Sequence, residues 1–277
     1  MLRLLGPEAA SNLGGGVLRT IGPWLPVSRV AERNLARAMP ERDPAERARI
    51  VRGVWDNLGR TAAELPHLPR LVQSASGPGW ECPDDSPMRM LRERGGPALL
   101  FSGHLANWEV GFPVAAAFGL SVSWFYRAAA NPLVEHVIQA MREAATGPGV
   151  PMFAKGAEGA RAALGHLRRG GLLGMLVDQK LNEGIAVPFF GRPAMTTTAL
   201  AQFALRLRCP VLPLRPVRIG PARFRILCDP FMELPDTGDR AADVVTLTTA
   251  MNATLERWIR EHPESWLWMH RRWPDEE

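Results

Sequence analysis

One segment of the chain holds two side chains that could do acid–base chemistry. It reads Phe-Ser-Gly-His-Leu-Ala-Asn-Trp-Glu over residues 101–109, and the apolar run 98–102 predicts a strand that ends there. His104 would then lie at the carboxyl end of a strand, where open α/β sheets bind their ligands. Glu109 follows five residues later, inside the next predicted helix and within reach of one ring nitrogen. Such a bond would fix the imidazole tautomer and leave the other nitrogen as a base for a hydroxyl.

The spacing alone admits a second interpretation, in which His104 caps a helix and Glu109 is solvated. A pairing of Ser102 with His104 is also open, although the two are too near in sequence to align easily. Because no cysteine neighbours His104, a cysteine nucleophile is not expected. The other histidines lack a paired spacing such as His-x3-His, and no glycine-rich phosphate loop of a standard type is present, so we expect neither a metal nor a cofactor. The glycine runs 14–16 and 170–171 are interpreted as turns.

From Pro97 onward, predicted strands alternate with predicted helices, and these elements must position the candidate residues. This alternation predicts an α/β sandwich with a largely parallel sheet. The predicted strands are 98–102, 122–126, 172–177, 211–217 and 224–227; the predicted helices are 107–118, 132–145, 157–168, 197–207 and 239–260. Residues 74–97 are rich in turn formers and predict a connection that holds one short helix.

Residues 1–73 predict an amphipathic, helical segment that forms one structural unit with an α/β domain over 74–277. Asp43, Pro44 and Glu46 provide the cap, first-turn proline and third-position acid of a helix start. The preceding segment is more apolar than a soluble N-terminus needs and, with Arg3 and Arg19, is interpreted as able to lie in a membrane interface. It does not contain the run of roughly 20 apolar residues that a membrane-spanning helix needs. It also lacks the charged start followed by an apolar stretch, and the small-residue cleavage site, of a secretory signal.

Composition narrows the function classes. The chain has 277 residues, 46% of them hydrophobic, so a disordered chain is excluded. Its net charge is +5, and only Lys155 and Lys180 of its 33 basic residues are lysines. Either a GC-rich genome or a surface for phosphate head groups, an anionic bilayer or an acidic carrier protein explains this charge. No nucleic-acid recognition motif is visible. Three distant cysteines indicate a reducing compartment.

Five blocks of sequence, in the family's order along the chain, carry a resemblance to a known family. The chain resembles the bacterial lipid A biosynthesis late acyltransferases (lauroyl/myristoyl acyltransferases), of the lysophospholipid acyltransferase superfamily, over nearly its whole length. Segment 101–109 resembles their His-x4-(Asp/Glu) motif. The other similar blocks are Val30–Leu35 with Met39–Glu41, Tyr126–Arg127 with Asn131, Pro132 and Arg142, Leu176–Gln179 with Val187–Ala194, and His262–Trp273.

The resemblance implies an αβα sandwich of the glycerolipid-acyltransferase type and transfer of a fatty acyl group from acyl-acyl carrier protein to a hydroxyl of a lipid A precursor. His104 would be the general base and Glu109 its orienting partner. The enzyme would act at the cytoplasmic face of the cell inner membrane, as a peripheral or monotopic protein. The expected substrate-binding residues are Arg127, Asn131, Arg142, Asp178, Gln179 and Arg192.

Several alternatives stay open. The acceptor could be another glycolipid, such as a phosphatidylinositol mannoside, or a lysophospholipid. The protein could also be no enzyme at all but a peripheral membrane-binding protein with a vestigial site. Arg127 and Arg142 could be surface charges, and Asp178 could brace a loop. The tryptophans at 266, 268 and 273 fit either a core or an interfacial belt that meets lipid phosphates.

Overall fold

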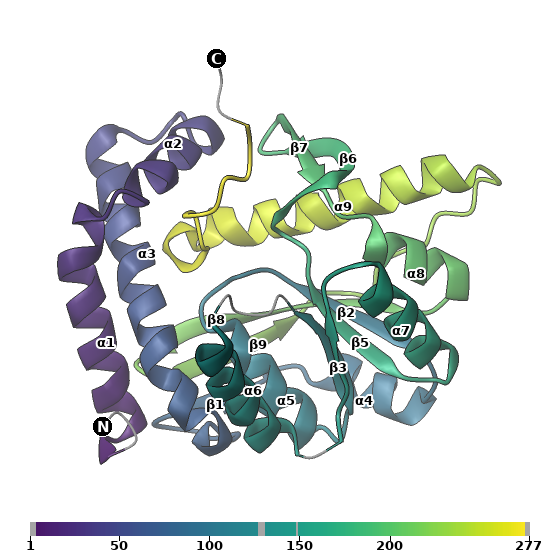
Figure 1. The fold of residues 1–277 in the computed structure, drawn as a ribbon, viewed down its shortest axis with the longest axis horizontal. Coiled ribbons are helices and arrows are strands. Elements are labelled where there is room, and N and C mark those ends of the chain that lie inside the picture. Colours follow the sequence, from purple (N-terminus) through teal and green to yellow (C-terminus); the bar gives the residue numbers. More distant parts are fainter. Residues whose placement is uncertain (1–3, 127–130, 148, 275–277) are drawn as a thin grey trace.

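The computed structural model describes residues 4–126, 131–147 and 149–274. Helices cover both faces of a central sheet, the long helix α9 crosses above it, and α1 and α3 stand together at one side (Figure 1). The helices of the described residues are α1 Pro7–Ile21, α2 Ser28–Ala38, α3 Pro44–Glu64, α4 Ser86–Arg94, α5 Gly111–Ala117, α6 Pro132–Thr146, α7 Ala157–Arg168, α8 Ala199–Leu207 and α9 Arg240–Glu261, with short 3-10 turns η2 Gly22–Trp24, η3 Leu65–Arg70, η4 Trp108–Val110 and η5 Pro263–Ser265.

Seven strands of the described residues form one mixed sheet in the order β1-β9-β8-β2-β5-β3-β4. The strands β8, β2, β5, β3 and β4 run parallel, whereas β9 is antiparallel to β8. A separate hairpin, β6–β7, lies outside this sheet. The bounds are β1 Gly79–Glu81, β2 Ala98–Ser102, β3 Val122–Tyr126, β4 Met152–Ala154, β5 Leu172–Leu176, β6 Lys180–Phe189, β7 Arg192–Thr196, β8 Val211–Gly220 and β9 Arg223–Cys228.

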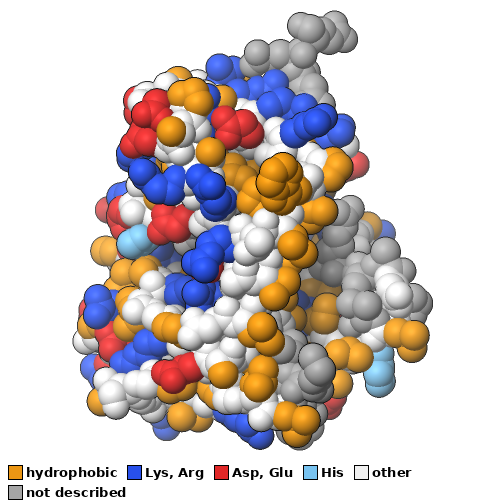
Figure 2. Space-filling view, turned by 90° about the vertical axis from the view of Figure 1, so that its left-hand side faces the viewer, with side chains coloured by type: hydrophobic (Ala, Val, Ile, Leu, Met, Phe, Trp, Pro, Cys, Tyr) orange, Lys and Arg blue, Asp and Glu red, His pale blue; other side chains and the backbone are white. Residues whose placement is uncertain are grey.

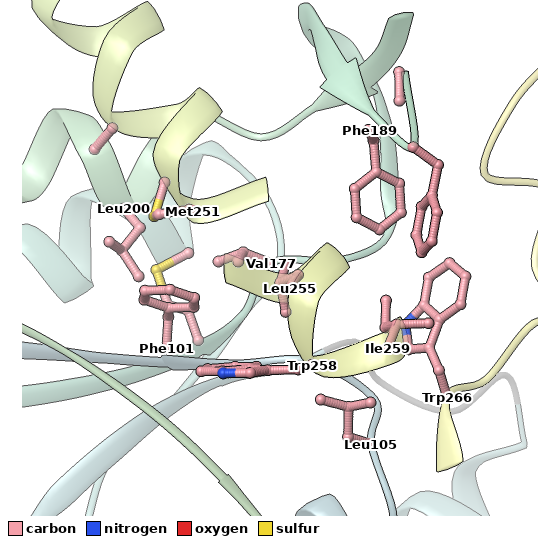
Figure 3. Packing of buried hydrophobic residues seen from close by; sticks show 14 of the residues in the cluster. Phe101, Leu105, Val177, Phe189, Leu200, Met251, Leu255, Trp258, Ile259 and Trp266 are labelled. Carbon is pink, nitrogen blue, oxygen red and sulfur yellow. The ribbon is translucent and has the colours of Figure 1, made fainter. Parts of the chain in front are cut away.

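The alternation of side chains along β2 divides the core into two layers. Leu99 and Phe101 belong to the cluster that β2 and β5 share with α3, α7, α8 and α9, and Ala98 and Leu100 belong to the cluster under α4 and α5. Figure 3 shows the first layer, where Trp258 of α9 lies against Phe101; the two rings are stacked with centroids 5.8 Å apart. The predicted α/β sandwich with a largely parallel sheet is confirmed.

The prediction missed four strands. β1 lies in the segment expected to hold only a short helix, and β4, β6 and β7 were not expected as strands. β1 and β4 are three residues long, too short for a recognisable period-2 pattern. Phe189, Phe190 and Gly191 connect the two strands of the β6–β7 hairpin, and both phenylalanines are buried.

The N-terminal helices begin and pack as their sequences dictate. Asp43 caps α3, its side chain accepting from the Glu46 N–H at 2.8 Å, and Glu46 reciprocates, which is the expected capping box. The interpretation of residues 14–16 as a turn is wrong, because they lie inside α1. A Cβ on Gly59 of α3 would stand 2.1 Å from the Gly14 carbonyl oxygen, so glycine here allows the two helices to touch backbone to backbone.

None of the helices of the described residues combines the length and the apolar character that a membrane crossing requires. The outer face of α1 nevertheless exposes large apolar side chains, namely Leu13, Val17 and Ile21, and Trp24 of η2 is 88% exposed.

Candidate active site

His104 follows the last residue of β2 by two positions, as the sequence predicts. Gly103 makes the turn, and a Cβ there would stand 3.0 Å from Leu255 and 3.3 Å from an Asp178 carboxylate oxygen. The glycine thus lets the loop after β2 approach the residue that follows β5. Because β2 and β5 are adjacent and parallel, their carboxyl ends bring His104 and Asp178 together.

The His104 ring is held by Asp178. Its Nδ1 lies 2.8 Å from Asp178 Oδ1, and the His104 backbone N–H donates to Asp178 Oδ2 at 2.8 Å. Trp266 donates its indole N–H to the same Oδ2 at 2.7 Å. With Nδ1 donating to the carboxylate, Nε2 is the ring's acceptor atom, and the Gln179 side-chain nitrogen lies 3.4 Å from it. This arrangement can take a proton from a hydroxyl placed at Nε2.

The contact between His104 and Asp178 shifts the pKa of both side chains. Burial alone would lower the pKa of His104, but the charge and hydrogen bond of Asp178 outweigh burial and raise that pKa above its ordinary 6.5. Burial alone would raise the pKa of Asp178, which is fully buried, but His104 holds it below its ordinary range. Asp178 therefore stays ionised, and His104 is a stronger base than a free imidazole.

The structure corrects the expected partner of His104. Glu109 does not hold the ring nitrogen; its two carboxylate oxygens accept from Arg142 Nη2 and Nε at 2.6 and 2.8 Å. Glu109 is buried and the Arg142 side chain is 16% exposed, so this ion pair ties α6 to the segment after β2. The alternative in which Arg142 is a surface charge is therefore wrong, and the expected role of Arg142 in substrate binding stays a prediction. Glu109 still acts on His104 at a distance, since its charge contributes to the raised pKa.

The remaining predicted binding residues fall in different places. Arg127 lies outside the described residues. Asn131 caps α6, its side-chain oxygen accepting from the Leu133 N–H at 2.9 Å. Gln179 lies against His104, and Asp178 is buried, so Asp178 orients the histidine rather than facing a substrate. Arg192 begins β7 and is exposed.

A set of α3 side chains, which the sequence analysis did not single out, supports the loop after His104. Ala106 has a positive φ of 46°, an uncommon conformation for a residue with a Cβ. Its carbonyl accepts from Asn57 Nδ2 at 3.0 Å and from the Thr61 hydroxyl at 2.9 Å. Glu64, fully buried, accepts from Asn107 Nδ2 at 2.8 Å and is paired with Arg218. The contacts hold a strained loop in one conformation.

The C-terminal segment reaches the same site from the other side. Trp266, Trp268 and Trp273 are buried, so the interpretation as an interfacial belt is wrong and these rings form core. Asn34 of α2 donates to the carbonyls of Trp268 and His270, both at 2.8 Å. The asparagine of the Val30–Leu35 block thereby fixes the segment whose Trp266 indole bonds Asp178.

A comparison with protein families identifies the chain. The family described as bacterial lipid A biosynthesis acyltransferase matches residues 1–275. The chain belongs to this family. It is therefore an enzyme of an acyltransferase family, and a lipid acceptor is implied. No curated protein sequence matches this acyltransferase.

Proposed function

We propose that this acyltransferase moves a fatty acyl group from acyl-acyl carrier protein to a hydroxyl of a lipid A precursor. The observation that carries the proposal is the 2.8 Å contact between His104 Nδ1 and the buried Asp178 carboxylate. It makes Nε2 a base at the carboxyl edge of the sheet. Family membership supports the class of acceptor.

The reaction needs one proton shuttle. His104 Nε2 takes the proton of the acceptor hydroxyl as its oxygen attacks the thioester carbonyl carbon. The tetrahedral intermediate then collapses, the carbon–sulfur bond breaks, and the departing thiolate takes the proton back from His104. Asp178 keeps the ring in one tautomer and stabilises the transient imidazolium, as the carboxylate of a serine-protease triad does. Gln179 can donate to Nε2 until the acceptor hydroxyl replaces it. We assign Arg127 to an acceptor phosphate or to the oxyanion, following the family resemblance.

The proposed location is the cytoplasmic face of the inner membrane, with the protein held at the bilayer surface. The exposed apolar side chains of α1 and η2, with Arg19 beside them, support this location, because such a face binds the interface of an anionic bilayer. Washing membranes with alkaline carbonate or high salt should release most of the protein. Full retention through both washes would contradict peripheral association.

Mass spectrometry of the host's lipids tests the reaction in the cell. Deletion of the gene should remove one acyl chain from a fraction of lipid A, and the loss should be restored by the wild-type protein but not by His104→Ala. Unchanged lipid A together with loss of an acyl chain from another glycolipid would contradict the proposed acceptor and leave acyl transfer standing.

A further inference from the structure

A pocket separate from His104 lies between α3, β8 and α9. Its volume is about 460 Å³, and one wall is Leu105, the residue that follows the candidate base. The residues that line the pocket include neither His104 nor Asp178. The pocket is built on β8, whereas Asp178 follows β5, and these two strands flank β2 on opposite sides. The pocket therefore backs the active-site loop and does not open onto the His104–Asp178 pair.

The lining of this pocket is strongly basic. Its side chains include two acids, Asp56 and Glu264, and five arginines, at positions 19, 49, 52, 215 and 218. Arg60 neutralises much of the charge of Asp56, since its Nε lies 2.5 Å from Asp56 Oδ2. Glu264 is exposed. Arg218 is paired with the buried Glu64 and Arg215 with Glu261, so the excess positive charge comes from the outer arginines 19, 49 and 52. This charge matches a phosphate anion, and the planar guanidinium fork suits the oxygens of a phosphate.

The deepest arginine has unused donors. Arg215 is 6% exposed, and its Nη2 is paired with Glu261. Its Nε and Nη1 are enclosed and have no hydrogen-bond partner within the described part of the chain. Buried guanidinium nitrogens without acceptors are costly. An anion in the pocket could accept hydrogen bonds from these two nitrogens and would add a second negative charge beside Arg215, next to that of Glu261.

The outer arginines are available to a ligand. Arg49 and Arg52 are exposed on α3. Arg49 reaches Glu46 only at 3.7 Å, and within the described residues Arg52 has neither an ion pair nor a hydrogen bond from its side chain. Arg19 lies 3.5 Å from Asp56 and is 58% exposed. These side chains can therefore turn toward an anion without losing strong partners.

The surface beside the pocket indicates what carries the phosphate. Figure 2 shows basic side chains gathered next to a column of hydrophobic side chains on this face of the molecule. Arg19 belongs to α1, whose exposed apolar residues include Val17 and Ile21. An amphiphile with an anionic head group matches a basic pocket beside an apolar face.

We propose that this pocket binds the phosphate group of an anionic lipid, at a site distinct from the acyl-transfer centre. The lipid source rests on the proposed membrane association, whereas the phosphate chemistry rests on the pocket alone. A soluble ligand separates the two claims, because its binding requires neither a bilayer nor acyl transfer.

The test is calorimetric titration of the full-length protein with dihexanoylphosphatidic acid below its micelle concentration. Dihexanoylphosphatidylcholine and inorganic phosphate are the comparison ligands, at one ionic strength. We expect saturable binding of the phosphatidic acid at one site, at least about 10-fold tighter than inorganic phosphate and absent for the choline lipid. The double variant Arg49→Gln/Arg52→Gln should weaken binding at least about 10-fold.

A matched control separates this pocket from net charge. Arg161→Gln/Arg168→Gln removes the same charge from exposed positions on α7 and should change the affinity by less than about two-fold. Equal losses in both double variants, or no saturable binding by the wild-type protein, would overturn the proposal. Inorganic phosphate binding as tightly as the lipid would reject the lipid source and keep a phosphate site. Even if a variant folds poorly, the wild-type titrations show whether the site is saturable and whether it prefers the phosphatidic acid to inorganic phosphate.

Discussion

The proposed reaction depends on a single residue, His104, whose basicity is set by one buried carboxylate. The raised pKa of His104 means that the inactive, protonated form persists to higher pH. The acid limb of kcat/KM should therefore have its midpoint above 6.5, the ordinary histidine value. In Asp178→Asn the carboxylate charge is lost and burial remains, so the residual activity should have its midpoint at a lower pH than the wild type.

A kcat/KM profile between about pH 5 and 9 measures both midpoints. The fold can be checked by near-ultraviolet circular dichroism at each pH. An acid limb that does not move in a folded Asp178→Asn variant would show that Asp178 does not set the titration.

Glu109 has a different predicted role, although the sequence motif places it with His104. Glu109→Gln leaves the largely enclosed Arg142 beside an uncharged partner, which should cost roughly 3–5 kcal/mol of unfolding free energy. The control Glu143→Gln lies on the same helix and is exposed, so it should change stability by less than about 0.5 kcal/mol. Urea unfolding of both variants checks this. Equal stability of the two variants would contradict a structural role for the Glu109–Arg142 pair.

At the scale of elements, the contact between α1 and α3 depends on glycine. Gly59→Ala would place a Cβ 2.1 Å from the Gly14 carbonyl oxygen and force the helices apart. We expect a loss of about 1–3 kcal/mol or more. Gly16→Ala is the control, because its Cβ would meet nothing within 4 Å and alanine favours the helix by up to about 1 kcal/mol.

Limited proteolysis at α1, together with urea unfolding, distinguishes these two variants. The Gly59→Ala protein should lose α1 to protease first, and Gly16→Ala should resist at least as well as the wild type. Similar stability of both variants would contradict the close packing of the two helices.

The sequence predicted the strands that carry the site but not the contact that defines it. β2 and β3 have the predicted bounds, and β5 ends one residue earlier than expected, since buried parallel strands are continuous apolar runs bounded by turns. His104 was placed correctly at a strand end. Its partner was not, because Asp178 is 74 residues away and only the order of strands in the sheet brings the two together. The polar residue Asp178, which directly follows the predicted strand 172–177, was the available signal.

At the scale of the whole molecule, both ends of the chain contribute to one histidine. Asn34 of α2 bonds the Trp268 carbonyl across 234 residues of sequence, and Trp266 of the same C-terminal segment bonds Asp178. The site is thus assembled from the N-terminal helices, the sheet and the C-terminal segment. Its side chains are positioned by packing, which no local sequence pattern encodes.

The net charge of +5 leads to a prediction about the donor. Acyl carrier proteins are acidic, so long-range attraction should speed their encounter with this basic chain. Added salt shortens the Debye length from about 10 Å at 0.1 M to about 3 Å at 1 M, and kcat/KM with acyl-acyl carrier protein should fall steeply over that range. Acyl-coenzyme A should be a poor donor. Equal kcat/KM for both donors, unaffected by salt, would contradict recognition of a carrier protein.

The central claim is that His104, oriented by Asp178, is the base for acyl transfer to a lipid hydroxyl. The most direct measurement is the initial rate of ester formation on a purified lipid A precursor by the wild type, His104→Ala and Asp178→Asn, with acyl-acyl carrier protein as donor. We predict no detectable transfer by His104→Ala and a loss in kcat of roughly 10²–10⁴-fold for Asp178→Asn, with both proteins folded. A folded His104→Ala enzyme that keeps the wild-type rate would contradict the account.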